Sequence, residues 1–167
     1  ITGNSPGNDT RFYTEKCEAM RNFANKIWNA SRFLMMNLTI DRCELPDRLE
    51  LEDKWILSKL NSVIPEVTEN MERYELGVAA QKVYDFIWSD FCDWYIEIAK
   101  TRLQTGDENV QKVLCYVLSG AMQLLHPFMP FITEEIWQAL PHEDGVEEGS
   151  FLMLQTWPEY QAELDFP

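Results

Sequence analysis

The chain has 167 residues, with 14 Lys and Arg against 28 Asp and Glu, so its net charge is −14. A chain of this length forms one domain that buries about 70% of its unfolded surface, and it contains no apolar run near the roughly 18 residues of a membrane span. The acidic excess excludes sequence-independent binding to DNA or to an anionic membrane, because such binding requires many Lys and Arg contacts.

The first forty residues differ in charge from the rest. They contain five basic and three acidic residues and carry +2, whereas the remainder carries −16. Contact with a nucleic acid is therefore expected to be local to this part. The opening residues, ITGNSPGNDT, favour turns over regular structure, and they lack the pattern of a signal peptide. We expect residues 1–12 to be a linker from an upstream domain.

Residues 14–37 have the period of an amphipathic helix, and Asp9, Thr10 or Thr14 is its expected cap. At about 100° per residue, one face of this helix gathers the side chains that should enter the core. These side chains are Met20, Phe23, Ala24, Ile27, Ala30, Ser31, Leu34 and Leu38.

A second stripe on the same helix is polar. Arg21, Asn25, Trp28 and Arg32 fall within an arc of about 60° and extend over about 16 Å. Guanidinium groups, amides and an indole are the side chains that hold phosphates and base edges and stack on unpaired bases. The stripe therefore predicts contact with RNA. The alternative is a helix edge that packs under a neighbouring element.

Four further helices follow, and strand-type alternation is limited to residues 151–157. The pattern predicts an all-α bundle of about five helices. We expect the bundle over residues 13–141 and a C-terminal extension over residues 142–167. The four helices are expected from Ile56 to Tyr74, over about 76–103, over 108–126 and over about 133–140.

Aromatic residues are concentrated in the segment 76–103. Trp88, Phe91, Trp94 and Tyr95 recur there at helical spacing, which predicts that they belong to the core. Replacing Trp94 is accordingly expected to unfold the domain.

The four cysteines show no metal-binding pattern. They are separated by 26, 49 and 23 residues, with no C-x-x-C pair and no histidine nearby to complete a zinc site. We expect Cys17, Cys43, Cys92 and Cys115 to be reduced thiols buried in the core.

Catalytic motifs are absent from the sequence. It has no glycine-rich phosphate loop, no G-x-S-x-G elbow and no H-E-x-x-H. His126 lies at a helix end, which favours a capping or core role over catalysis, and His142 lies in an acidic loop with no evident catalytic partner. Solvated faces and helix N-termini explain the carboxylate pairs Asp90/Asp93 and Glu134/Glu135 more simply than acid–base chemistry. We expect no catalytic residue, metal or cofactor on this chain.

Six segments, in this order and at these separations, resemble the anticodon-binding region of the valyl-tRNA synthetase family, a class I aminoacyl-tRNA synthetase family. The likeness extends over essentially the whole chain. Isoleucyl- and leucyl-type relatives share the helical plan, but RNFANKIWNASRF with FCDWYIEIAK resembles the valine family in particular. The segments are SPGNDTRF, RNFANKIWNASRF, DKWILSKLN, YDFIWSDFCDWYIEIAK, LLHPFMPFITEEIWQAL and QTWPEY.

The resemblance implies a cytoplasmic protein in which this domain follows a catalytic domain of the same polypeptide and holds the anticodon arm of the valine tRNA. ATP binding and aminoacylation would belong to the full-length enzyme, because the HIGH-like and KMSKS-like signatures are not found in these 167 residues. No DNA or membrane partner is expected. The resemblance also implies a C-terminal coiled coil after the Trp157-Pro158 region, which is expected outside these residues.

The resemblance also places the RNA-binding surface on the first helix. Lys100 and Arg102 form a second candidate cluster, for which the alternative is a cationic last turn favoured by the helix dipole. Two other functions stay open: the same module from an isoleucyl- or leucyl-type synthetase, and a helical scaffold that packs on another protein domain. The implied first-helix residues are Arg21, Asn25, Trp28, Asn29, Arg32 and Phe33, with Trp28 and Phe33 as stacking candidates.

Overall fold

The computed structural model describes residues 13–143, 145–146 and 149–166, and it confirms the all-α prediction. No strand occurs within these ranges. The expected linker over residues 1–12, with the possible caps Asp9 and Thr10, lies outside them. The third candidate cap, Thr14, is wrong, because Tyr13 holds the N-cap position and Thr14 is the first residue of the helix. The helices are α1 (Thr14–Asn37), α2 (Leu51–Glu72), α3 (Leu76–Asp85), η1 (Phe86–Tyr95), α4 (Ile96–Gln104), α5 (Glu108–Leu125), α6 (Pro130–Gln138), η2 (Leu152–Leu154) and η3 (Ala162–Leu164).

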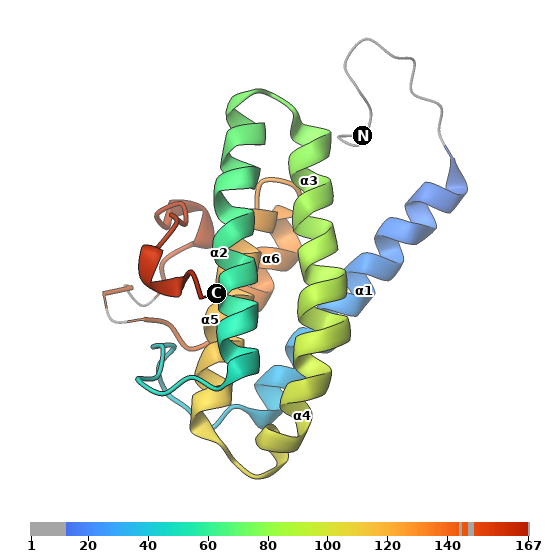
Figure 1. Cartoon of the computed structure of the whole chain (residues 1–167). Coiled ribbons are helices and arrows are strands. Elements are labelled where there is room, and N and C mark those ends of the chain that lie inside the picture. The colour runs from blue at the N-terminus through green and yellow to red at the C-terminus, as the bar shows by residue number, and fades with distance from the viewer. Residues whose placement is uncertain (1–12, 144, 147–148, 167) are drawn as a thin grey trace.

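Helix α5 forms the centre of the bundle. It contacts α1, α2, α3, α4 and α6, and much of its length is buried. Figure 1 shows α2 and α3 side by side as an antiparallel pair, with α5 and α6 behind them. Because α3, η1 and α4 follow one another without a break, the bundle has five helical units, as the sequence predicts. No helix in the described part of the chain is both long enough and apolar enough to cross a bilayer.

The N-terminal half of α1 projects from this bundle (Figure 1). Every residue from Tyr13 to Asn22 is exposed, and the helix enters the core only from Phe23 onward. The predictions that Met20 and Cys17 are buried are therefore wrong, because both precede the point where the helix meets the bundle. The cysteines at positions 43, 92 and 115 are buried and free, as expected.

The segment η1 is a π-helix, in which backbone hydrogen bonds reach five residues ahead instead of four. Buried side chains recur at every fourth residue before, within and after it. In an α-helix a four-residue repeat drifts by about 40° at each step, and the wider π turns keep this row facing the core. The row consists of Ala79, Val83, Ile87, Phe91, Tyr95, Ala99 and Leu103.

This wider winding turns Trp94 away from the core. The side chain is 62% exposed, so the prediction that Trp94 is a core residue is wrong. Phe91 and Tyr95 are buried as predicted, and Trp88 is partly buried. The prediction followed the 3.6-residue period of an α-helix, which places Trp94 on the inner face but does not apply within η1.

The expected C-terminal extension packs back onto α2. Ser58 Oγ accepts a hydrogen bond from Phe166 N at 2.7 Å, and Asn61 Oδ1 accepts one from Gln161 N at 2.8 Å. Trp157 Nε1 donates to a threonine hydroxyl in the same helix at 2.8 Å. The possible strand at residues 151–157 instead contains the short 3-10 helix η2.

Candidate nucleic-acid interface

The polar stripe of α1 lies on the exposed side of the helix. Arg21, Asn25, Asn29 and Arg32 are exposed, and Trp28 retains 39% of its surface. The opposite face buries four side chains in the bundle. Among the described residues, no neighbouring element packs over this stripe.

The two arginines of this stripe differ from most basic residues of the protein. Neither Arg21 nor Arg32 forms an ion pair with any of the described residues. Because a guanidinium group stays charged and offers five donors in a planar fork, both side chains are available to bind phosphate or a base edge from solution.

Phe33 and Lys100, predicted from distant parts of the sequence, lie close together. The Lys100 Nζ atom is 5.8 Å from the centroid of the Phe33 ring, and it donates a hydrogen bond to Glu97 Oε1 at 2.5 Å. Phe33 is partly buried against the core. The structure thus joins α1 to α4 at the edge of the exposed stripe.

Lys26 belongs to the same edge, although the sequence pattern did not single it out. It precedes Phe33 by seven residues, so the two side chains lie within about 20° of each other on α1. Its Nζ atom is 3.7 Å from the centroid of the Trp88 ring and 2.5 Å from Asp93 Oδ1. The seven-residue spacing from Phe33 was a signal for this residue, but Lys26 lies outside the narrower stripe on which the prediction rested.

The Trp88 ring is part of an aromatic stack that joins α1 to α3 and η1. Its centroid is 5.6 Å from that of Tyr84, with the rings 11° from parallel, and the Tyr84 centroid is 4.5 Å from that of Phe23. Lys26 therefore covers the Trp88 ring at a place where α1 is firmly packed.

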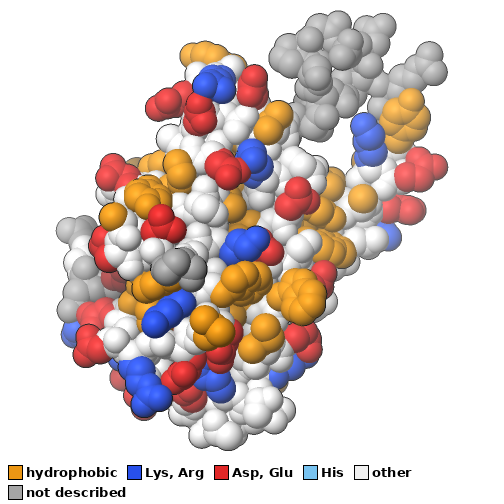
Figure 2. Space-filling view, in the orientation of Figure 1, with side chains coloured by type: hydrophobic (Ala, Val, Ile, Leu, Met, Phe, Trp, Pro, Cys, Tyr) orange, Lys and Arg blue, Asp and Glu red, His pale blue; other side chains and the backbone are white. Residues whose placement is uncertain are grey.

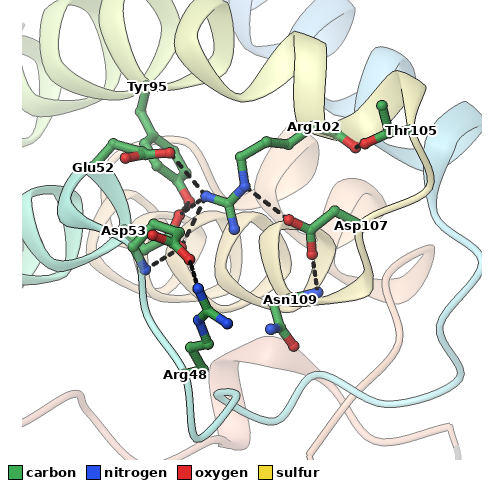
Figure 3. Close-up of polar contacts among 9 residues, drawn as sticks. Arg48, Glu52, Asp53, Tyr95, Arg102, Thr105, Asp107 and Asn109 are labelled. Atoms are coloured by element: carbon green, nitrogen blue, oxygen red, sulfur yellow. Dashed lines mark hydrogen bonds and ion pairs between the residues drawn. The ribbon is translucent and has the colours of Figure 1, made fainter.

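Arg102 occupies a different environment. Figure 3 shows its guanidinium group among carboxylates from α2 and from the start of α5. Its Nη1 atom donates to Asp53 Oδ1 at 2.8 Å and to Glu52 Oε1 at 3.1 Å, and its Nε atom donates to Asp107 Oδ2 at 2.8 Å. Asp53 is fully buried and also accepts a hydrogen bond from the Tyr95 hydroxyl at 2.7 Å.

We call these five residues the Arg102 cluster. They connect α2, η1, α4 and the N-cap of α5, because Asp107 Oδ1 also accepts from the first turn of that helix. The structure does not bring Arg102 to the α1 surface. Its contacts are structural, which favours the alternative in which Arg102 is a cation of the last helical turn. We therefore do not include Arg102 in the RNA-binding surface.

The pKa shifts in the Arg102 cluster follow from this pairing. Burial alone would raise the pKa of Asp107, but the hydrogen bond and charge of Arg102 hold it below its usual value. Burial and the Asp53 carboxylate raise the pKa of Tyr95. The pKa of Arg102 is raised, because its hydrogen bonds to Asp107 and Asp53 outweigh the effect of burial. All three groups therefore keep their ordinary charge state at neutral pH.

Both histidines have packing roles. His126 follows the last residue of α5, and its Nδ1 atom is 2.8 Å from Thr133 Oγ1. The His142 ring stacks on Trp137 with centroids 4.0 Å apart, and burial lowers its pKa. The position of His126 agrees with the capping or core role expected from the sequence, whereas the stacking of His142 was not predicted.

Three of the four carboxylates singled out in the sequence have structural partners. Asp90 Oδ2 lies 3.7 Å from Lys59 Nζ, and Asp93 pairs with Lys26. Glu134 accepts the Leu152 backbone N–H at 3.0 Å. Asp90 and Asp93 thus each face a lysine, Glu134 holds a backbone N–H, and Glu135 is exposed.

The chain belongs to the family of anticodon-binding domains of tRNA ligases. The profile described as "Anticodon-binding domain of tRNA ligase" matches residues 53–166, which is more than half of the chain. A leucyl-type synthetase, in the crystal structure titled as the ternary complex of Agrobacterium radiobacter K84 agnB2 LeuRS-tRNA-LeuAMS, has the same fold. Its TM-score is 0.67 at 21% identity, over 94% of this chain and 18% of that one.

Among tRNA ligases, the chain is similar to the valine enzymes. It is 51% identical over 174 residues to the valine–tRNA ligase of Oceanobacillus iheyensis, and 51% identical over 172 residues to that of Carboxydothermus hydrogenoformans. These alignments cover 100% of this chain and 19% of each relative. The chain thus corresponds to the anticodon-binding part of these ligases and spans about a fifth of their length.

Proposed function

We propose that this domain binds the anticodon arm of the valine tRNA through the outer stripe of α1 and the adjoining edge formed with η1 and α4. The main support is the pair of exposed arginines, unpaired within the described chain, that flank an exposed tryptophan on a projecting helix. The identity to valine–tRNA ligases supports the choice of tRNA. The proposed residues are Arg21, Asn25, Lys26, Trp28, Asn29, Arg32, Phe33 and Lys100.

The chemistry of this surface suits unpaired RNA. The Trp28 ring offers a face on which a splayed base can stack, and Arg21 and Arg32 can each hold a phosphate or a base edge with two hydrogen bonds. Asn25 and Asn29 add donors and acceptors for the edges of bases. The stripe is about 16 Å long, which matches a few nucleotides of a loop.

The charge distribution favours a selective contact over a general one. The first forty residues carry +2 within a chain of −14. The rest of the protein is predominantly acidic and repels the phosphates of an RNA that approaches it elsewhere. We infer that the domain holds one shaped loop at α1 and does not bind nucleic acids along its length.

We further infer that the domain serves a valine–tRNA ligase of the cytoplasm by positioning the tRNA for translation. ATP-dependent aminoacylation would take place in a catalytic domain of the same polypeptide, outside these residues. The length of the relatives supports this division, because the chain corresponds to only 19% of each of them.

The direct test compares binding of the valine tRNA with binding of the same tRNA carrying a different anticodon, over a series of salt concentrations. We expect anticodon replacement to weaken binding, and log affinity to fall linearly with log salt concentration. Equal affinity for both RNAs would contradict the proposal. If the stripe is instead a docking surface for another protein domain, we expect no RNA binding that depends steeply on salt concentration.

A further inference from the structure

An apolar groove runs between α2 and the η1–α4 segment, on a face of the domain separate from the α1 stripe. Its volume is about 800 Å³. Figure 2 shows hydrophobic side chains gathered over these elements on the face toward the viewer. We call it the tryptophan groove, after two of its apolar lining residues. Its five apolar lining residues are Leu51, Trp55, Trp94, Ile98 and Phe166.

The exposure of this groove is unusual for side chains of such size. Leu51 is 80% exposed, Trp94 62% and Ile98 45%. Single exposed apolar residues are common on proteins, but a contiguous group with a hollow between them marks an interaction site. Large aromatic side chains of this kind dominate the binding energy of protein interfaces.

The π-helix is a second observation that points to the same face. An α-helix through residues 86–95 would turn Trp94 inward, whereas the π winding directs it outward. Ile98 lies one turn further along and is exposed beside it. Since π segments are rare and occur frequently at functional sites, the outward aromatic face is a specific feature of this helix.

The charges around the groove favour an apolar protein segment over RNA. The charged residues that line the groove are Glu52 and Lys54, and Glu52 is paired with Arg102. The Lys54 Nζ atom lies 5.7 Å from the centroid of the Phe166 ring. These two charges cancel at the rim, and residues 41–167 together carry −16. A polyanion therefore finds no excess of positive charge here.

We propose that the tryptophan groove binds an apolar segment of the parent polypeptide that lies outside residues 1–167. This inference rests on the proposed parent, a valine–tRNA ligase. The relatives are about five times longer than this chain, so most of each relative is available to cover this face. A covalently linked segment also has a high effective concentration, so that a modest apolar interface is enough to hold it.

Cysteine labelling tests this proposal in the full-length ligase. In a Cys17→Ser background, an Ile98→Cys substitution places a reactive thiol in the groove, and a Met36→Cys substitution provides the control on α1, where the native side chain is 81% exposed. The rate of maleimide labelling is measured for each variant in the full-length enzyme and in the 167-residue chain. Circular dichroism confirms that every variant is folded.

We expect the Ile98→Cys thiol to react at least tenfold more slowly in the full-length enzyme than in the 167-residue chain. The labelling rates of the Met36→Cys thiol in the two proteins should differ by less than this factor. Equal Ile98→Cys rates in both proteins would overturn the proposal. Protection that appears only with added tRNA, or only at high concentration of the short chain, would also overturn it, since RNA or a second copy would then be the occupant. The labelling requires no RNA, so its result is independent of whether the α1 stripe binds tRNA.

Discussion

Two regions of this domain use arginine in opposite ways. On α1, Arg21 and Arg32 are exposed and form no ion pair with the described residues. In the Arg102 cluster, one guanidinium group binds three carboxylates, one of them fully buried. An arginine whose N–H donors have no partner is thus available to bind a ligand, whereas one whose donors bind carboxylates stabilises the fold. The difference shows that position relative to the core decides the role.

The largest effect is expected for Arg102→Ala. It leaves the Asp53 carboxylate buried without its cation, and breaking a buried pair in this way costs about 3–5 kcal/mol of the free energy of unfolding. Urea denaturation followed by circular dichroism measures the loss. The matched variant Arg32→Ala should change stability by less than about 0.5 kcal/mol. If both variants lost the same free energy of unfolding, the proposed difference between the two regions would be wrong.

The next effect is expected in RNA binding. Trp28→Ala should weaken binding of the valine tRNA by about 1–3 kcal/mol, the range for one stacked base, without unfolding the domain. Arg32→Ala should also weaken binding and lower the salt slope by about 1, the value for one phosphate contact. Filter binding at several salt concentrations measures both. Normal binding by Trp28→Ala would remove this residue from the interface.

A smaller effect is expected for Asp107→Asn. Asparagine retains the N-cap of α5 but loses the ion pair with Arg102, which is partly screened by solvent, so the loss at pH 7 should be about 1 kcal/mol.

The pH dependence of this loss follows from the pKa of Asp107. The folded protein holds this pKa below the usual 3.8, so the ion pair stabilises the fold above that pH and is lost as the pH falls through the lowered value. Wild type and variant should therefore converge in acid. A difference in unfolding free energy that stayed constant with pH would contradict the assignment.

The smallest effect is expected for Trp94→Ala in the isolated chain. Because this side chain is 62% exposed, its removal should cost less than about 1 kcal/mol. Thermal unfolding measures this change. Tyr95→Ala is the internal comparison, since the neighbouring side chain is fully buried and its loss should cost about 3–5 kcal/mol. If the Trp94→Ala variant were unfolded, Trp94 would have to be a core residue, which would contradict this prediction.

Much of the fold was predictable because it depends on local periodicity. The apolar spacing over residues 14–37 predicted the limits of α1 that the structure shows, and its polar face was predicted from the same repeat. Trp94 was predicted wrongly, because the number of residues in a turn is a property of packing and a π segment cannot be read from an α-helical period.

The candidate site was predictable only in part, for a different reason. The stripe residues lie on one helix, so their spacing alone brings them together. The partners of Arg102 on α2 lie 49 and 50 residues away in the sequence, and no local pattern indicates such a contact. Lys26 was missed because it lies outside the narrow stripe on α1, and because its partners, Trp88 and Asp93, come from another helix.

The π winding of η1 also sets the orientation of every side chain on α4. Removing one residue from a helix rotates each later side chain by the angle of one residue, which is about 100° in an α-helix. Deleting Ser89, an exposed residue of η1, would thus swing Lys100 away from Phe33 and Arg102 away from Asp53, although neither side chain is altered. The helix from Leu76 to Gln104 therefore tolerates changes in composition at its exposed positions far better than changes in length.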